Sequence, residues 1–170
     1  MIRRPRREED ITPLTFDCGL LCGSRCCKGG KDAGMRLFPG ETPDGSFTVQ
    51  KTPDGGRLLL CGGRCDRKVR PLSCRIFPLF PYLGEDGRIR AGFDPRAFAV
   101  CPLVRARFTP SLPFIRQVRR IGRRLAADPD GRRFLAGQTA ELRLLGDMIP
   151  RWEPYPRLRL HTNPKRRSSR

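Results

Sequence analysis

FDCGLLCGSRCCKGG, residues 16–30, places four cysteines within ten positions, namely Cys18, Cys22, Cys26 and Cys27. A second group follows downstream and consists of Cys61, Cys65, Cys74 and Cys101. Cysteines that are two to four residues apart allow one short loop to aim two sulfurs at the same ion. The only histidine, His161, lies far from both groups. The sequence therefore predicts that these eight cysteines are thiolate ligands of a metal.

Disulfides, redox thiols and simple packing are the alternative interpretations of the cysteines. The first 16 residues, MIRRPRREEDITPLTF, are charged and lack the apolar segment of a secretory signal. No later stretch approaches the length of a membrane span. We therefore expect a cytoplasmic protein with no membrane partner, and a reducing cytosol favours metal ligands or redox thiols over disulfides. Burial as small core residues explains a scattered cysteine, but not four in ten residues.

RPLSCRIFP, residues 70–78, completes a pattern that resembles a known family. Together with the stretch that ends in a Cys-Cys pair, it is similar to the CxxCxxCC family of zinc- or iron-chelating proteins, also called the YkgJ-type cysteine-cluster family. The resemblance covers residues 16–102 and implies metal ligation rather than a reaction. Both gaps in the first motif hold three residues, whereas the family name implies two. The likeness depends on Cys18, Cys22, Cys26, Cys27, Arg70, Pro71, Cys74, Arg75 and Pro78.

The segment between the two cysteine groups has the pattern of β-strands. MRLF at 35–38, SFTVQ at 46–50 and RLLLC at 57–61 are separated by turn sequences that contain Pro-Asp-Gly. Proline presets φ and glycine accepts the positive φ of a turn, so residues 52–56 predict a β-hairpin. This hairpin would return Cys61 toward the first cluster. Arg70 and Arg75 are candidates to offset the negative charge of a thiolate site, although arginine is common throughout the chain.

Cysteine disappears after Cys101, and the pattern becomes helical. Phe114, Val118, Ile121 and Leu125 share one face of a predicted helix that begins near Pro113, and arginines fill its other face. Residues 128–131, DPDG, should break this helix. A second predicted helix ends at Pro150 and carries a stripe made of Phe134, Gln138, Leu142, Leu145 and Ile149.

These patterns predict an α+β fold: a small loop-rich, metal-stapled cysteine domain with a β-hairpin, followed by an α-helical hairpin. We expect a charged leader over residues 1–13, a metal-binding domain over 14–110, the helical hairpin over 111–150, and a basic Pro/Arg-rich tail over 151–170 that is disordered at its end. The chain has only 170 residues and 38% hydrophobic residues. Its apolar core is therefore modest, and metal ligation would add to its stability.

The formal net charge is +18, and most of it lies after Cys101. A basic helix face and a basic tail could bind a nucleic acid or an acidic protein partner. The aromatic residues are not interleaved with the arginines along the sequence, which argues against a surface that binds single-stranded nucleic acid. A solvated helix face explains the same charge without any partner.

No catalytic constellation is apparent, and the sequence leaves enzymatic activity undecided. The leading hypothesis is a protein that binds a zinc or iron ion through cysteine thiolates, as a structural site, a store or a carrier. One alternative is an iron–sulfur protein with a [4Fe–4S] cluster, for which the Cys101-Pro102 pair is a weak indication. A nucleic-acid-binding module with structural zinc is the other alternative.

Overall fold

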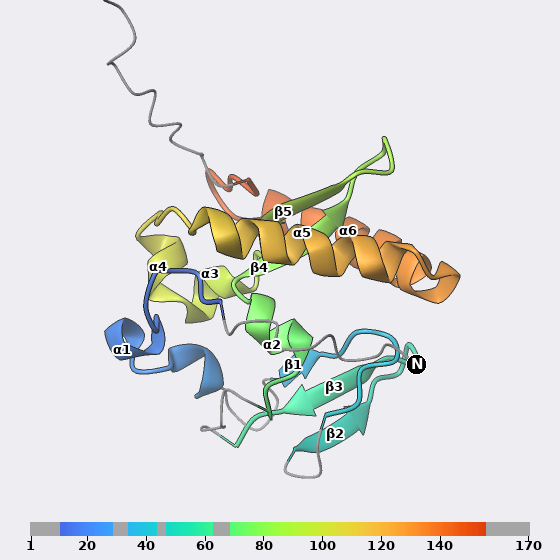
Figure 1. Ribbon diagram of the computed structural model, residues 1–170, viewed down its shortest axis with the longest axis horizontal. Helices are drawn as coiled ribbons and strands as arrows, with labels where there is room; N and C mark the ends of the chain where they lie inside the picture. Colours follow the sequence, from blue (N-terminus) through green and yellow to red (C-terminus); the bar gives the residue numbers. More distant parts are fainter. Residues whose placement is uncertain (1–10, 29–33, 44–46, 63–68, 156–170) are drawn as a thin grey trace, which may run out of the picture.

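The computed structural model describes residues 11–28, 34–43, 47–62 and 69–155, and it has an α+β fold (Figure 1). Two antiparallel sheets occur together with helices, so the fold class predicted from the sequence is confirmed. The predicted basic tail beyond Tyr155, and the leader before Ile11, lie outside the described residues. The elements are α1 (Gly19–Cys22), the 3-10 helix η1 (Arg25–Cys27), β1 (Gly34–Arg36), β2 (Thr48–Lys51), β3 (Arg57–Leu60), α2 (Leu72–Ile76), β4 (Leu79–Leu83), β5 (Ile89–Phe93), α3 (Ala97–Val100), α4 (Pro102–Arg105), α5 (Leu112–Ala126) and α6 (Pro129–Asp147).

The first sheet contains the predicted hairpin. Its strand order is β1-β3-β2, and β3 pairs antiparallel with both neighbours. The turn between β2 and β3 closes when the Thr52 amide donates to the Gly56 carbonyl oxygen at 2.9 Å. Gly55 has a φ of 78°, which is the positive φ that the Pro-Asp-Gly pattern predicts. Local turn chemistry therefore sets this hairpin, and β3 ends immediately before Cys61.

The second sheet is a hairpin of β4 and β5, in which Leu79 pairs with Phe93 and Leu83 with Ile89. No strand over residues 79–83 was predicted from the sequence. β4 reads LFPYL and is buried at four of its five positions, so it lacks the alternation that marks a half-buried strand. Pro81 also weakens a strand assignment, although the free edge of a two-stranded sheet tolerates proline.

Helix α5 packs against this second sheet through the predicted stripe. Its four stripe residues are at most 3% exposed: Phe114, Val118, Ile121 and Leu125. Ser111 caps the helix by accepting a hydrogen bond from the Phe114 amide. A Cβ atom added at Gly122 would lie 2.4 Å from Cβ of Pro81, which shows how closely the helix approaches β4. The apolar face of α5 therefore packs against β4 and β5.

The chain breaks between α5 and α6 where the sequence predicted, and α6 begins within the DPDG stretch itself. Asp128 accepts a hydrogen bond from the Gly131 amide, and Pro129 occupies the first turn, so DPDG also starts α6. Two polar residues of α6, Gln138 and Thr139, are buried. The Thr139 hydroxyl accepts a hydrogen bond from the Leu83 amide at 3.0 Å and so ties α6 to β4.

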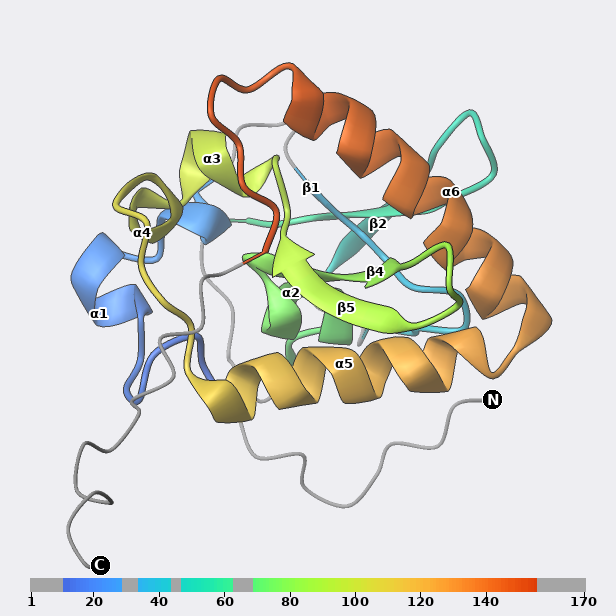
Figure 2. The ribbon, with the colours of Figure 1, turned by 90° about the horizontal axis from the view of Figure 1, so that it is seen from above.

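The two long helices enclose the second sheet. Figure 2 shows α5 and α6 meeting at their connecting turn and opening away from each other, with β4 and β5 between them. The core formed there includes Tyr82, Phe114, Leu135 and Leu142, all at most 1% exposed. Within the described ranges, no helix is long and apolar enough to cross a membrane.

Candidate metal centre

The first cysteine group lies on two short helical turns. In α1, the Cys22 amide donates to the Cys18 carbonyl oxygen at 3.3 Å, so these two cysteines are one helical turn apart. Gly23 and Ser24 then adopt positive φ values of 59° and 56°, which end α1 and start a new turn. In one continuous helix, Cys18, Cys22 and Cys26 would lie on the same face. Because the helix ends at Cys22, Cys26 does not share that face.

Cys26 and Cys27 differ in exposure but are hydrogen-bonded to each other. Cys26 is exposed, whereas Cys27 is 8% exposed. Cys27 also forms a hydrogen bond with Cys61, which follows the end of β3. The predicted hairpin thus brings a cysteine from the second group beside the first, and the structure joins Cys26, Cys27 and Cys61 in one chain of thiol contacts.

Arg70 also contacts Cys27. Its Nη2 atom donates to Sγ of Cys27 at 3.7 Å. Nε of Arg75 donates to the backbone oxygen of Arg70 at 2.8 Å, which holds the Arg70 backbone near the sulfur. Of the two arginines singled out in the sequence, Arg70 contacts a cysteine directly and Arg75 positions Arg70. A guanidinium in this place favours negative charge on the sulfurs.

The electrostatic environment separates the two adjacent thiols. The hydrogen bond from Cys27 lowers the pKa of Cys26 below its ordinary 9.0, against the opposing effects of burial and of Cys22 and Cys18. The same hydrogen bond, together with burial, raises the pKa of Cys27. Cys26 is therefore the thiol that ionises first, and its thiolate is held by the thiol of Cys27.

Cys101 extends the group toward the helical half of the molecule. It lies between α3 and α4, and it is 8% exposed. Burial raises the pKa of Cys101, and the charge of Cys22 raises it further. Figure 1 shows α1 and η1 at the same end of the molecule as α3 and α4, away from the tip of the β4–β5 hairpin. The sulfurs of the first group and of Cys101 thus share one end of the fold.

The structure does not assemble all eight predicted ligands. Cys74 is half-buried on α2, and Cys65 lies outside the described residues. None of the seven described cysteines is in a disulfide. In the part of the chain that the structure describes, no group of three or more His, Cys, Asp or Glu side chains is arranged to hold a metal ion. The thiol contacts are therefore pairwise, and a complete ligand set is not formed by the described residues alone.

Glu41 was missed in the sequence, although it positions the helix that carries Cys74. Its carboxylate accepts hydrogen bonds from the Phe38 amide at 3.0 Å, from the Ser73 amide at 3.4 Å and from the Leu72 amide. Burial raises the pKa of Glu41, and these hydrogen bonds oppose the rise. Glu41 caps α2 from 31 positions away in the chain, so no local motif could have indicated this role.

No family model, no curated protein and no solved structure matches this chain.

Thiol alkylation tests the order of ionisation in the metal-free, reduced protein. At neutral pH, Cys26 should react with iodoacetamide faster than Cys27 and Cys101, because its lowered pKa gives it a larger thiolate fraction than thiols whose pKa is raised. The difference in alkylation rate should become smaller as the pH rises, since Cys27 and Cys101, whose pKa values are raised, ionise only at higher pH. Mass spectrometry with fragmentation assigns the modified residue.

The matched control for this measurement is a pair of arginine variants. Arg70→Ala should slow the alkylation of Cys26, because the positive charge of Arg70 lowers its pKa. Arg88→Ala removes the same charge near the tip of the β4–β5 hairpin and should change nothing (Figure 1). Equal alkylation rates at Cys26, Cys27 and Cys101 in the unaltered protein would contradict the assignment.

Proposed function

We propose that this protein binds zinc or iron through cysteine thiolates. The observation that carries the proposal is the chain of contacts among Cys26, Cys27 and Cys61, which joins two segments more than thirty positions apart. Soft thiolate donors without histidine suit Zn²⁺ and iron–sulfur clusters, and they suit Mg²⁺ and Ca²⁺ poorly. The resemblance of the cysteine pattern to the CxxCxxCC family supports the same function.

The charge near the sulfurs also supports a thiolate site. A divalent ion with four thiolates has a net charge of about −2, which neighbouring cations must offset. Arg70 supplies such a cation at 3.7 Å from Sγ of Cys27. Thiols must lose their protons to bind a metal, and Cys26 already has a lowered pKa. Binding at Cys26 would also release the hydrogen bond that raises the pKa of Cys27.

Further ligands must complete the site, because the described side chains do not form a closed set. We propose Cys65 as one of them, since its C-x3-C spacing from Cys61 lets a single loop supply two sulfurs. Cys18 and Cys22 are close enough to Cys26 to act on its pKa, which makes them the candidates on the first segment. A site that keeps its thiols reduced also fits the cytoplasm.

Anaerobic purification followed by elemental analysis and a visible spectrum tests the proposal. Zinc is colourless and takes no electron, whereas an iron–sulfur cluster absorbs broadly in the visible range and bleaches on reduction. Either result supports thiolate ligation and names the metal. A protein that purifies without metal, and that takes up neither zinc nor iron when reduced, would refute the proposed function.

Single Cys→Ser variants test the ligand set. If two four-thiolate zinc sites exist, the eight variants should fall into two groups that each lose about half of the metal. If one [4Fe–4S] cluster exists, four variants should lose all the iron and four should lose almost none. Cys27→Ser and Cys61→Ser are expected to lose metal together under either arrangement, because these two sulfurs are in contact.

The Arg70→Ala variant is the control for this series, because it keeps every thiol. It should weaken metal affinity by about ten- to a hundredfold without changing the number of ions bound at saturation. Full metal content in all eight serine variants would show that thiolates are not the ligands.

A further inference from the structure

Two cavities lie on either side of the segment that follows α6, and the larger one is lined by arginines and aromatic rings. It has a volume of about 360 Å³ and lies between residues 149–155, α3, and residues 104–109. Its lining includes Arg105, Arg107, Arg151, Phe98, Trp152 and Tyr155. We call it the arginine–aromatic pocket. It contains none of the cysteines of the candidate metal centre.

The backbone of this pocket is unusual. Only three non-glycine residues among those described have a positive φ, and two of them, Arg107 at 52° and Arg151 at 58°, line this one pocket. An L-residue pays a steric penalty in this conformation that glycine avoids. Strained backbone of this kind is concentrated at binding sites, where the surrounding structure holds a functional side chain in place.

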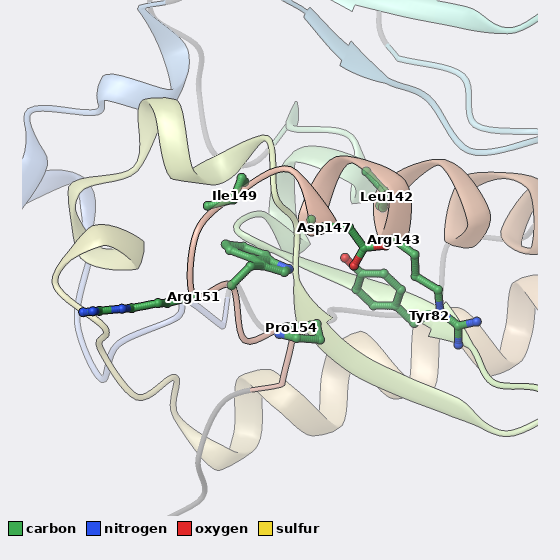
Figure 3. Close-up of a pocket in the computed structure, with 9 residues that line it drawn as sticks. Tyr82, Leu142, Arg143, Asp147, Ile149, Arg151 and Pro154 are labelled. Atoms are coloured by element: carbon green, nitrogen blue, oxygen red, sulfur yellow. The ribbon is translucent and has the colours of Figure 1, made fainter.

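Figure 3 shows how the segment after α6 divides the two cavities. In the smaller cavity, of about 300 Å³, Tyr82 and Arg143 lie next to each other. Arg151 lines both cavities, and its side chain points away from Tyr82 and Arg143. It therefore projects toward α4, where Arg105 and Arg107 line the arginine–aromatic pocket.

The charge and the aromatic rings of the pocket indicate the class of ligand that it would bind. Three guanidinium groups outnumber the single carboxylate in the lining, which belongs to Glu153, and guanidinium groups bind phosphate in a bidentate manner. The ring of Phe98 packs edge-to-face against Trp152 with centroids 6.4 Å apart, and Tyr155 is partly exposed. Exposed aromatic faces stack with planar bases. The volume is within the range of small-molecule sites.

We propose that the arginine–aromatic pocket binds a nucleoside monophosphate, with the phosphate on the arginines and the base against the aromatic rings. Along the sequence the aromatic residues are not interleaved with the arginines, and the fold brings the two kinds together. This inference is independent of the metal centre. A nucleotide within a single strand carries the same chemistry, and the volume fits one free nucleotide.

Titration with adenosine 5′-monophosphate tests the proposal on the full chain. Trp152 is the only tryptophan and lines both cavities, so quenching of its fluorescence reports binding at either one. Loss of quenching in a variant of Arg107, which lines only the larger cavity, assigns the binding to the arginine–aromatic pocket. Calorimetry should give a dissociation constant between micromolar and millimolar. Adenosine and ribose 5-phosphate should each bind at least about tenfold more weakly, because each lacks one half of the recognised chemistry.

The test variant is Arg107→Gly combined with Arg151→Gly. Glycine accepts a positive φ without a steric penalty, so the melting temperature should stay the same or rise while nucleotide affinity falls at least about tenfold. Arg116→Ala combined with Arg120→Ala removes the same charge from the exposed face of α5 and should leave binding unchanged.

A short deoxyadenylate oligomer distinguishes the two sources of a nucleotide. If the oligomer binds and loses affinity only in the glycine variant, the pocket accepts a nucleotide within a strand. If only the monophosphate binds, the ligand is a free nucleotide. Absence of binding by both, equal monophosphate affinity in the glycine variant, or an equal loss in both variants would overturn the proposal. The last result would mean that net charge alone attracts the ligand.

Discussion

Chelation of the metal is expected to unfold the cysteine-rich end of the protein while the helical core keeps its structure. A structural zinc site contributes on the order of 10 kcal/mol of binding energy that is also folding energy. α1 and η1 have little apolar burial to replace it. Leu20 and Leu21 on α1 are 80% and 62% exposed, and Cys27 is the one buried residue within these two helices.

Hydrogen exchange with mass spectrometry measures this expected loss by segment. In the metal-free protein, protection should fall over residues 16–28 and remain over 114–125 and 135–146. β4 and β5 should also stay protected, because their side chains belong to the core of α5 and α6. Adding zinc back should restore protection. Unchanged exchange over 16–28, with unchanged circular dichroism, would contradict a stabilising role for the metal.

Phe114→Ala is expected to destabilise the helical core rather than the cysteine-rich end. Phe114 is completely buried between α5 and the rest of the core. Truncating such a phenylalanine lowers the free energy of unfolding by about 3–5 kcal/mol, from lost burial and the cavity left behind. Because the total stability of a domain is about 5–15 kcal/mol, this variant should lose a large share of it. Urea denaturation followed by circular dichroism measures the loss.

Leu112→Ala is the matched control, because Leu112 lies on the same helix and is 51% exposed. It should change the free energy of unfolding by less than about 0.5 kcal/mol. Metal content per folded molecule should be equal in the two variants, since neither residue is a candidate ligand. Similar losses of stability in both would mean that α5 does not pack against β4 and β5 as described.

The predictions that succeeded depend on local chemistry. The stripe of α5 is readable because Phe114, Val118 and Ile121 repeat with the helical period, and this period does not depend on the partner surface. The β2–β3 hairpin is readable because residues 52–56 carry their own turn geometry. The break predicted at DPDG is present, and Asp128 followed by Pro129 also carried a readable signal for the start of α6, an N-cap followed by proline.

The second hairpin shows what local chemistry cannot indicate. Leu79, Phe80 and Tyr82 form β4, which lies between α5 and α6. A strand that is buried on both faces has no alternation of polar and apolar residues, so its pattern does not identify it. Only the packing of two helices on the same sheet makes this strand recognisable.

The sequence alone determined the chemical identity of the candidate ligands, the helical and hairpin segments, and the excess of positive charge, because each depends on residue type and short-range spacing. The tertiary structure alone decided which of these residues meet. It placed Cys61 against Cys27 and Arg70 beside them, it capped α2 with the distant Glu41, and it gathered arginines and aromatic rings into one pocket. Such contacts join residues tens of positions apart, and they form only when the burial of the common core brings their segments together.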